Sequence, residues 1–252
     1  MNLTSEQEAV LKGGSGRVLA RYMKWFVDWG QAMGAERLVP VTNVHCILRT
    51  PLLKGMSEDT LDVYIEEFRA LCRHKVKCKT LTHAKTKCRT SAPSQLMEIS
   101  SEDEKGISQR ELDFQEELNR IAQEAGISTT WSCTPYLVGS VPAFGEICAW
   151  TESSAVVFAN SILGARTTRH GMESSLAAAF LGWVPEFGVL LTENRKASIQ
   201  VEVDADVGSK SDWGALGYFA GEIAGTEIPV FNGVDRIGPE EAKQLSATLP
   251  YS

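Results

Sequence analysis

Residues 109–133 read QRELDFQEELNRIAQEAGISTTWSC, and this stretch indicates the fold class. Its residues 112–122 repeat apolar side chains at three- and four-residue steps, which is the spacing of an amphipathic helix. Gly126 follows as a C-cap, because glycine readily adopts the left-handed conformation that ends many helices. Residues 127–131 then predict a strand that leads into Cys133. A helix followed directly by a strand is typical of an α/β protein, and that is the fold class we expect.

The chain before this stretch predicts two helices and a strand. A capping box at residues 4–7 begins a short helix, and the apolar spacing over residues 16–34 predicts a longer one. Residues 37–45 predict a single short buried strand that ends at His45. Sites in α/β proteins usually lie at strand ends, so His45 is a candidate catalytic residue. A core histidine with satisfied hydrogen bonds is the alternative.

A basic segment covers residues 69–89 and follows a predicted helix over residues 58–74. Its cysteines and histidines permit a zinc site, but the segment has no C-x-x-C pair. Nucleic-acid binding is a second possibility, although aromatic residues that stack on bases are absent from it. We favour a solvated basic strand and loop, followed by a polar surface loop at residues 91–108. The zinc ligands would come from Cys72, His74, Cys78, His83 and Cys88.

Composition narrows the possible partners. The chain has 252 residues and a formal net charge of −7, which gives no general attraction to nucleic acid or to an anionic membrane. No leader-like N-terminus and no spanning apolar segment are present, so we expect a cytoplasmic protein that binds neither membrane nor nucleic acid. Its six cysteines are then expected to be thiols or metal ligands rather than a disulfide framework.

Residues 133–171 place charged side chains among residues that are otherwise suited to burial. The charges are Glu146, Glu152, Arg166 and Arg169. Burying an unpaired charge costs several kcal/mol, so we expect these groups to pair with one another, with a metal or with a ligand. We expect Arg166 and Arg169 to lie on one side of a helix or turn, where guanidinium groups suit a carboxylate or phosphate. A small anionic substrate is the favoured partner, and a packed helix with internal salt bridges is the alternative.

The same stretch offers candidates for catalysis. Glu146 and Glu152 are the candidate general acid and base, and Ser153 and Asn160 are candidate donors to substrate oxygens. Residue type alone leaves Cys133 open as an iron ligand, a nucleophile or an inert buried thiol. Cys148 is expected in the core.

The chain resembles the catalytic domain, or large subunit, of the aconitase X family, which includes phosphomevalonate dehydratase and cis-3-hydroxy-L-proline dehydratase. The resemblance is extended and covers nearly the whole chain. Its clearest carriers are Gly34-Ala35-Glu36-Arg37-Leu38, Cys133-Thr134-Pro135-Tyr136, Glu152-Ser153-Ser154, Phe158-Ala159-Asn160-Ser161, Gly164-Ala165-Arg166-Thr167, Pro185-Glu186-Phe187-Gly188 and Glu193-Asn194-Arg195.

The resemblance implies an aconitase-like α/β fold of mixed helices and sheet, an iron or iron–sulfur centre, and removal of water from a small hydroxylated acid. Cys133 becomes the candidate iron ligand, and Arg166 and Arg169 the groups that hold the substrate anion. The remaining substrate and second-layer groups are Glu146, Glu152, Ser153 and Asn160, with His45 lining the same cleft.

Family members run on beyond the last residue of this sequence. We therefore expect residues 1–252 to be the N-terminal portion of the catalytic domain, incomplete relative to the family, with a small swivelling domain as a separate subunit or fusion. The expected activity is that of a hydro-lyase, with cis-3-hydroxy-L-proline as the first substrate and 5-phosphomevalonate as the alternative. A non-catalytic remnant or assembly subunit is the rival hypothesis.

Overall fold

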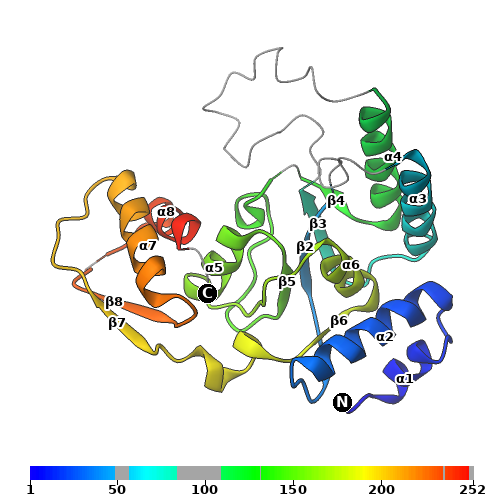
Figure 1. Cartoon of the computed structure of the whole chain (residues 1–252), viewed down its shortest axis with the longest axis horizontal. Helices are drawn as coiled ribbons and strands as arrows, with labels where there is room; N and C mark the ends of the chain where they lie inside the picture. Colours follow the sequence, from blue (N-terminus) through cyan, green and yellow to red (C-terminus); the bar gives the residue numbers. More distant parts are fainter. Residues whose placement is uncertain (49–56, 84–108, 131, 235, 250–252) are drawn as a thin grey trace.

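The computed structural model describes residues 1–48, 57–83, 109–130, 132–234 and 236–249 (Figure 1). Its central sheet has four strands in the order β4-β3-β2-β5, and all neighbouring strands run parallel. Parallel strands joined through helices are the α/β architecture that the sequence predicted, so this expectation is confirmed. The strands are β2 (Asn43–Ile47), β3 (Lys79–His83), β4 (Ser128–Thr129) and β5 (Cys148–Trp150).

Helices cover both faces of this sheet. Side chains alternate along a strand, so Val44 and Cys46 point to one face of β2 and His45 points to the other. Val44 and Cys46 belong to the main core, whereas Trp150 of the neighbouring strand packs in a second cluster against α5. Among the helices that contribute to the main core are α2 (Arg17–Ala32), α3 (Glu58–Cys72), α4 (Gln109–Ala125) and α6 (Met172–Leu181), while α5 (Ser153–Ser161) covers the opposite face.

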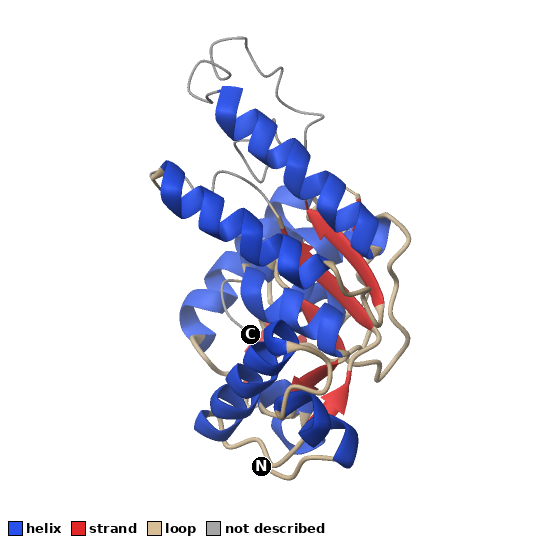
Figure 2. Cartoon of the chain, turned by 90° about the vertical axis from the view of Figure 1, so that its right-hand side faces the viewer, coloured by secondary structure: helices blue, strands red, loops and turns tan. Residues whose placement is uncertain are grey.

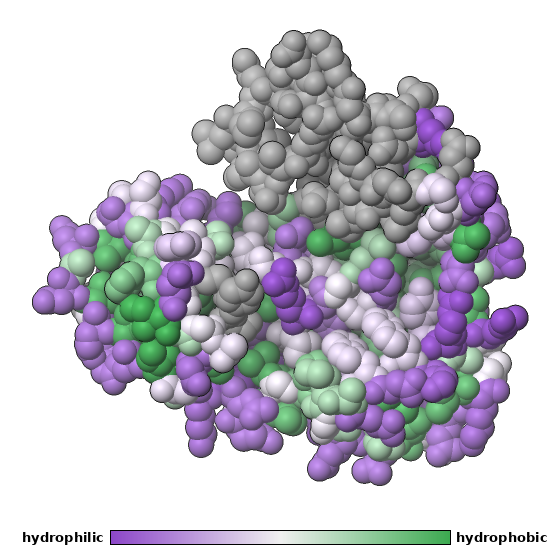
Figure 3. All heavy atoms as spheres, viewed as in Figure 1, coloured by the Kyte–Doolittle hydropathy of each residue, from purple (hydrophilic) through white to green (hydrophobic). Residues whose placement is uncertain are grey.

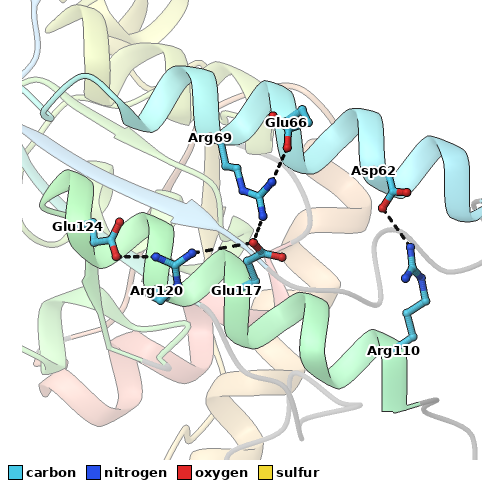
Figure 4. A network of polar contacts seen from close by, with 7 residues as sticks. All are labelled: Asp62, Glu66, Arg69, Arg110, Glu117, Arg120 and Glu124. Carbon is cyan, nitrogen blue, oxygen red and sulfur yellow. Dashed lines mark hydrogen bonds and ion pairs between the residues drawn. The ribbon is translucent and has the colours of Figure 1, made fainter.

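Helices α3 and α4 pack side by side, as the view in Figure 2 shows, and ion pairs tie their outer surfaces together (Figure 4). The guanidinium of Arg69 on α3 contacts both Glu66 and Glu117, and Glu117 lies on α4. Arg120 adds a second cation 3.9 Å from the Glu117 carboxylate. A separate pair, Arg110 to Asp62 at 3.0 Å, joins the same helices further along. Glu117 is therefore shared between two arginines, whereas Asp62 has one.

Replacing Glu117 by glutamine is expected to lower the melting temperature more than Asp62→Asn does, because it removes the charge that two arginines share. The difference should shrink in 1 M NaCl, where the Debye length falls to about 3 Å. Thermal unfolding of both variants at low and high salt measures this. Equal melting temperatures for the two variants at low salt would show that the network does not connect the helices.

Smaller units flank the central sheet. α1 (Ser5–Leu11) begins with the predicted capping box, in which Gln7 N–H donates to Thr4 Oγ1 at 3.2 Å. β1 (Leu38–Pro40) pairs antiparallel with β6 (Trp183–Pro185). The C-terminal part contains β7 (Ile199–Glu202), α7 (Lys210–Ala224), β8 (Pro229–Asn232) and α8 (Pro239–Thr248), with β7 parallel to β8. None of the described helices is long and apolar enough to span a bilayer.

The single strand predicted over residues 37–45 is wrong, because the chain forms two strands that belong to different sheets. Pro40 ends β1, Val41 donates its N–H to Gly182 O, and Thr42 donates to Ile147 O as β2 begins. The chain therefore passes from the β1–β6 pair to the central sheet within two residues. His45 consequently lies in the middle of β2 rather than at a strand end.

Within the described residues, the strand that we predicted in the basic segment forms only over Lys79–His83, as β3. β3 lies inside the central sheet between β2 and β4, so its backbone is not a half-exposed edge. The strand predicted over residues 127–131 is shortened to β4. The polar loop expected at residues 91–108, and Cys88 with it, lie outside the described residues.

Candidate functional site

The carboxyl ends of β2, β4 and β5 lie on one side of the sheet, because these strands belong to one parallel set. His45 is fully buried in the middle of β2, and its Nε2 reaches the segment after β4, where it lies 2.9 Å from the backbone oxygen of Ser132. A carbonyl oxygen only accepts hydrogen bonds, so this contact assigns the ring proton to Nε2. Thr151 donates its hydroxyl to His45 O at 3.1 Å. His45 therefore ties the segment after β4 to the segment after β5, as the core-histidine alternative predicts.

Three candidate residues follow these tied segments. Cys133 comes directly after Ser132 and is half-buried. Its loop lies against α5, because Tyr136 stacks on Phe158 with ring centroids 4.0 Å apart. Glu152 is the N-cap residue of α5 and is half-buried, and Ser153 is the first helical residue and is exposed. We call these three residues, with His45, the carboxyl-end cluster.

Glu146 lies before β5, at the opposite end of the strand. One carboxylate oxygen accepts from Thr42 Oγ1 at 2.6 Å, and the other accepts from Ala143 N at 2.6 Å. A strand rises about 3.3 Å per residue, and all of β5 (Cys148–Trp150) lies between Glu146 and Glu152. The length of β5 therefore separates the two carboxylates by about 10 Å. The structure therefore does not bring the two candidate acid–base carboxylates together.

Residues 164–170 form an extended segment beside β5, not the helix or turn that we expected for Arg166 and Arg169. Parallel bridges pair Ile147 with Arg166 and Trp150 with Arg169. Arg166 donates to Leu190 O at 2.6 Å and to Thr192 Oγ1 at 2.9 Å. Arg169 is exposed, and its side chain makes no hydrogen bond or ion pair within the described part of the chain. The two arginines therefore lie at different levels of the sheet, with Arg169 at the level of Trp150.

Asn160 at the end of α5 holds this extended segment in place. Its amide nitrogen donates to Thr167 O at 2.8 Å and to Val156 O at 3.0 Å, and its Oδ1 accepts from Thr167 N at 3.3 Å. Arg195 adds a bond to Asn160 Oδ1 at 2.9 Å. The donors and the acceptor of the Asn160 side chain are thus engaged within the protein.

Two residues that support this region were not singled out from the sequence. Arg195 lies in a segment that contributed to the family resemblance, but nothing in its local pattern indicated a contact with α5. Asn43 Oδ1 accepts from Trp150 Nε1 at 3.0 Å and from Ser140 Oγ at 2.8 Å, beneath the carboxyl-end cluster. Asn43 is 3% exposed, and a buried polar residue in an apolar run is the signal that could have identified it.

The expectation that the four charges are buried is wrong. Glu146, Glu152 and Arg166 are half-buried and Arg169 is exposed, so none carries the full penalty of burial. Among the described residues, no ion pair joins these four side chains to one another. Cys148 is fully buried, as expected, and burial raises the pKa of its thiol well above the usual range.

His170 follows Arg169 and is the one buried side chain of the described region with an atom, Nδ1, that has no hydrogen-bond partner. Its Nε2 lies 3.2 Å from Thr168 Oγ1, and its ring meets the edge of Trp29 with centroids 5.7 Å apart. Complete burial lowers the pKa of His170 to about 4, because water no longer stabilises the imidazolium. The folded protein therefore holds this ring neutral.

His170 is expected to make the protein less stable as the pH falls. The folded pKa is about 4 and the ordinary value is 6.5, so between these values the unfolded chain binds a proton that the folded chain does not. The free energy of unfolding should fall by about 3 kcal/mol from pH 7.5 to pH 4 through this residue alone. Urea unfolding of wild type and His170→Leu over this range measures it. Parallel pH profiles for the two proteins would contradict this pKa.

The described residues do not by themselves fit an iron or iron–sulfur centre. No three of their histidine, cysteine, aspartate or glutamate side chains are placed to hold a metal ion. Cys133 is the only cysteine in the carboxyl-end cluster, and clusters of iron and sulfur need several thiolates. Burial raises the pKa of Cys78 to about 11, which keeps that thiol protonated at neutral pH. The same search finds no zinc site in the described part of the basic segment.

The sequence of this chain matches the models of one known protein family. The family model described as the aconitase X first domain matches residues 1–193, and the model of the second domain matches residues 197–250. A crystal structure of Thermococcus kodakaraensis aconitase X, described as the holo-form, superposes with a TM-score of 0.81 at 34% identity and covers 99% of this chain.

Curated relatives carry two different names. "Phosphomevalonate dehydratase large subunit" from Thermococcus kodakarensis is 37% identical over 99% of this chain, and the same-named protein of Methanocaldococcus jannaschii is 35% identical over 100%. "Cis-3-hydroxy-L-proline dehydratase" from Hypocrea jecorina is 30% identical over 95%. The chain spans 58%, 61% and 38% of these three relatives, respectively.

Proposed function

This chain belongs to the aconitase X family, and on that premise we propose that it is the large subunit of a dehydratase that removes water from phosphomevalonate. The supporting observation is the match of 99% of this chain, at 37% identity, to 58% of a large subunit of that name. Cis-3-hydroxy-L-proline is the first substrate expected from the sequence, but the relatives favour the alternative, because the named hydroxyproline enzymes are 30% and 28% identical. Residues 1–252 would form the N-terminal portion of the catalytic domain.

We assign the chemistry to the carboxyl-end cluster. Dehydration requires a base for the proton next to a carboxylate, an acid for the departing hydroxyl, and cations for the substrate anion. Glu152 is our candidate for proton transfer, since it is half-buried and caps α5 at the end of a parallel strand. Ser153 would donate to a substrate oxygen, and the uncommitted guanidinium of Arg169 would bind the anion. His45 would position the segments that carry these groups.

We assign supporting roles to the remaining candidates. Arg166 would fix the extended segment to residues 190–192, and Asn160 would fix it to α5, so that Arg169 is held beside the cluster. Glu146 would hold the turn before β5 through Thr42 and Ala143 N. Each of these residues would then act on turnover through the position of Arg169 or β5, rather than by touching substrate.

For the cofactor, we propose that Cys133 supplies one thiolate and that the other ligands lie outside the described residues. The solved relative described as a holo-form supports a bound cofactor in the family. When bound, iron would draw electrons from the substrate hydroxyl. Iron content of the anaerobically purified assembly tests this: Cys133→Ser should lower it, and Cys148→Ser should leave it unchanged. Full iron content in the Cys133 variant would remove this residue from the ligand set.

For the partner, we propose a small subunit that completes the site. The relatives are named large subunits, which implies a small subunit in their assemblies. This inference is independent of the residue assignments above.

Arg169→Ala is expected to raise the KM for the substrate about tenfold or more, because one charge-assisted hydrogen bond contributes about 1.5–3 kcal/mol. Its melting temperature should match wild type, since the exposed guanidinium makes no hydrogen bond or ion pair within the described residues. Arg166→Ala should instead lower the melting temperature, because it frees Leu190 O and Thr192. Steady-state kinetics and thermal unfolding of both variants measure this split. An unchanged KM for Arg169→Ala would remove Arg169 from the substrate site.

The proposed function is tested on the assembly purified anaerobically from cells that make this chain. Incubation with phosphomevalonate should yield a product that has lost one water, detected by mass spectrometry. The Thermococcus enzyme under the same conditions is the positive control. Absence of product from this assembly, with product in the control, would favour the rival hypothesis of a non-catalytic subunit.

A further inference from the structure

Helix α7 is apolar on the side that faces away from the protein. Trp213, Ala220 and Ala224 are buried on its inner side. Tyr218 and Phe219 are each 61% exposed and Ile223 is 54% exposed, and Phe219 and Ile223 share one face at a four-residue spacing. A helix that is apolar on all sides is normally buried on all sides. We call Tyr218, Phe219 and Ile223 the outer face of α7.

Charge is nearly absent from this part of the helix. From Trp213 to Ala224 the only charged residue is Glu222. Figure 3 shows hydrophobic side chains gathered over α7 and the neighbouring β7–β8 sheet, at the left of the view. Single exposed apolar residues are common on protein surfaces, whereas a contiguous apolar patch marks an interaction site. The outer face of α7 therefore has the composition of an interface that is permanently covered.

The adjoining sheet also lacks a full cover. β7 and β8 form a two-stranded parallel pair, and parallel sheets are almost always covered on both faces. Val230 on β8 is 43% exposed, and a cavity of about 310 Å³ lies between β8, α5 and α8. Exposed Ile162 and Ile237 also line this cavity, so an apolar opening faces outward. Both the helix and the sheet thus present unburied apolar surface in the same C-terminal unit.

The comparisons identify what could cover this surface. The second-domain family model ends at residue 250, and the Thermococcus relative is matched over 58% of its length by 99% of this chain. About two fifths of that relative therefore has no counterpart in these residues, and this region is long enough to cover an exposed apolar surface. The outer face of α7 is the most apolar exposed helix surface among the described elements.

We propose that the outer face of α7 and the open β7–β8 sheet are the docking surface for the polypeptide region that the relatives carry beyond the matched part. That region would cover Phe219 and Ile223 and place an apolar side chain against the cavity opening beside Val230. Whether it is joined to this chain or separate does not change the contact. The inference rests on surface chemistry and on the length of the relatives, so it is independent of the substrate.

The test is co-expression of tagged residues 1–252 with the unmatched region of the Thermococcus relative as a separate chain. We expect the two polypeptides to co-purify in equal amounts. Phe219→Asp combined with Ile223→Asp should reduce the captured region at least tenfold, since a charge would be buried at each position. Val63→Asp is the matched control, because Val63 is 64% exposed on α3, and it should capture as much as wild type.

Three outcomes would overturn the proposal. The first is a failure of the Thermococcus region to bind wild type. If that region is soluble alone, it would not co-purify with residues 1–252. If it is insoluble alone, co-expression would not make it soluble. The second is that the double variant captures as much as wild type. The third is self-association of residues 1–252 in sedimentation that the double variant abolishes, which would assign the surface to a second copy of this chain. None of these results depends on whether the assembly dehydrates phosphomevalonate.

Discussion

Glu152→Gln is expected to reduce kcat by about 10²–10⁴, the range typical of removing a group that transfers a proton. The substitution keeps the size of the side chain and removes its ability to take up a proton. Because Glu152 is the N-cap residue of α5 with no capping hydrogen bond from its side chain, helix stability should change little. Single-turnover and steady-state kinetics of the complete assembly measure the effect.

Glu146→Gln is the matched control for this prediction. Its carboxylate accepts from Thr42 and Ala143 at the far end of β5, so glutamine there should cost about 1 kcal/mol of stability and less than tenfold in kcat. The reverse order, with Glu146→Gln as the inactive variant, would contradict our assignment of the chemistry to the carboxyl-end cluster. It would move the site to the amino ends of the strands.

The second large effect is expected at Asn43. Asn43→Leu should lower the free energy of unfolding by about 4 kcal/mol, because it leaves two buried donors, Trp150 Nε1 and the Ser140 hydroxyl, without an acceptor. Each buried unsatisfied group costs about 1–3 kcal/mol, and the branched side chain must also fit a space shaped for an amide. Urea unfolding of the variant and of wild type measures the difference.

A double-mutant cycle controls for the change in shape at Asn43. Ser140→Ala alone removes one of the two donors, so the effects of Asn43→Leu and Ser140→Ala should be less than additive. Strict additivity would show that the hydrogen bond to Ser140 does not contribute to stability. A loss below about 1 kcal/mol for Asn43→Leu would contradict the role of Asn43 as the buried link between β2 and β5.

The helices could be predicted from the sequence because their signals are local. Residues 4–7 carry a capping box, and Gly126 has the positive φ of 100° that glycine adopts without strain. α2, α3 and α4 have the apolar faces that their spacing indicated. The fold class followed from this alternation of helices and strands.

The strands were less predictable because distant residues decide where they end. Whether residues 37–45 form one strand or two depends on the pairing of β1 with β6, about 145 residues away along the chain. The segment with Arg166 and Arg169 is extended because it pairs with β5, and no local pattern carries that information. Glu146 and Glu152 lie apart because β5, which pairs with β2, extends between them. The sequence therefore named the candidate carboxylates without showing that they lie apart.

Substrate preference of the native assembly tests the central claim most directly. The assembly would be purified anaerobically from the cells that make this chain, and kcat/KM would be measured for phosphomevalonate and for cis-3-hydroxy-L-proline. We predict dehydration of phosphomevalonate with a kcat/KM at least about tenfold higher, since one lost charge-assisted contact costs about 1.5–3 kcal/mol. A higher kcat/KM for cis-3-hydroxy-L-proline, or dehydration of neither compound, would contradict it.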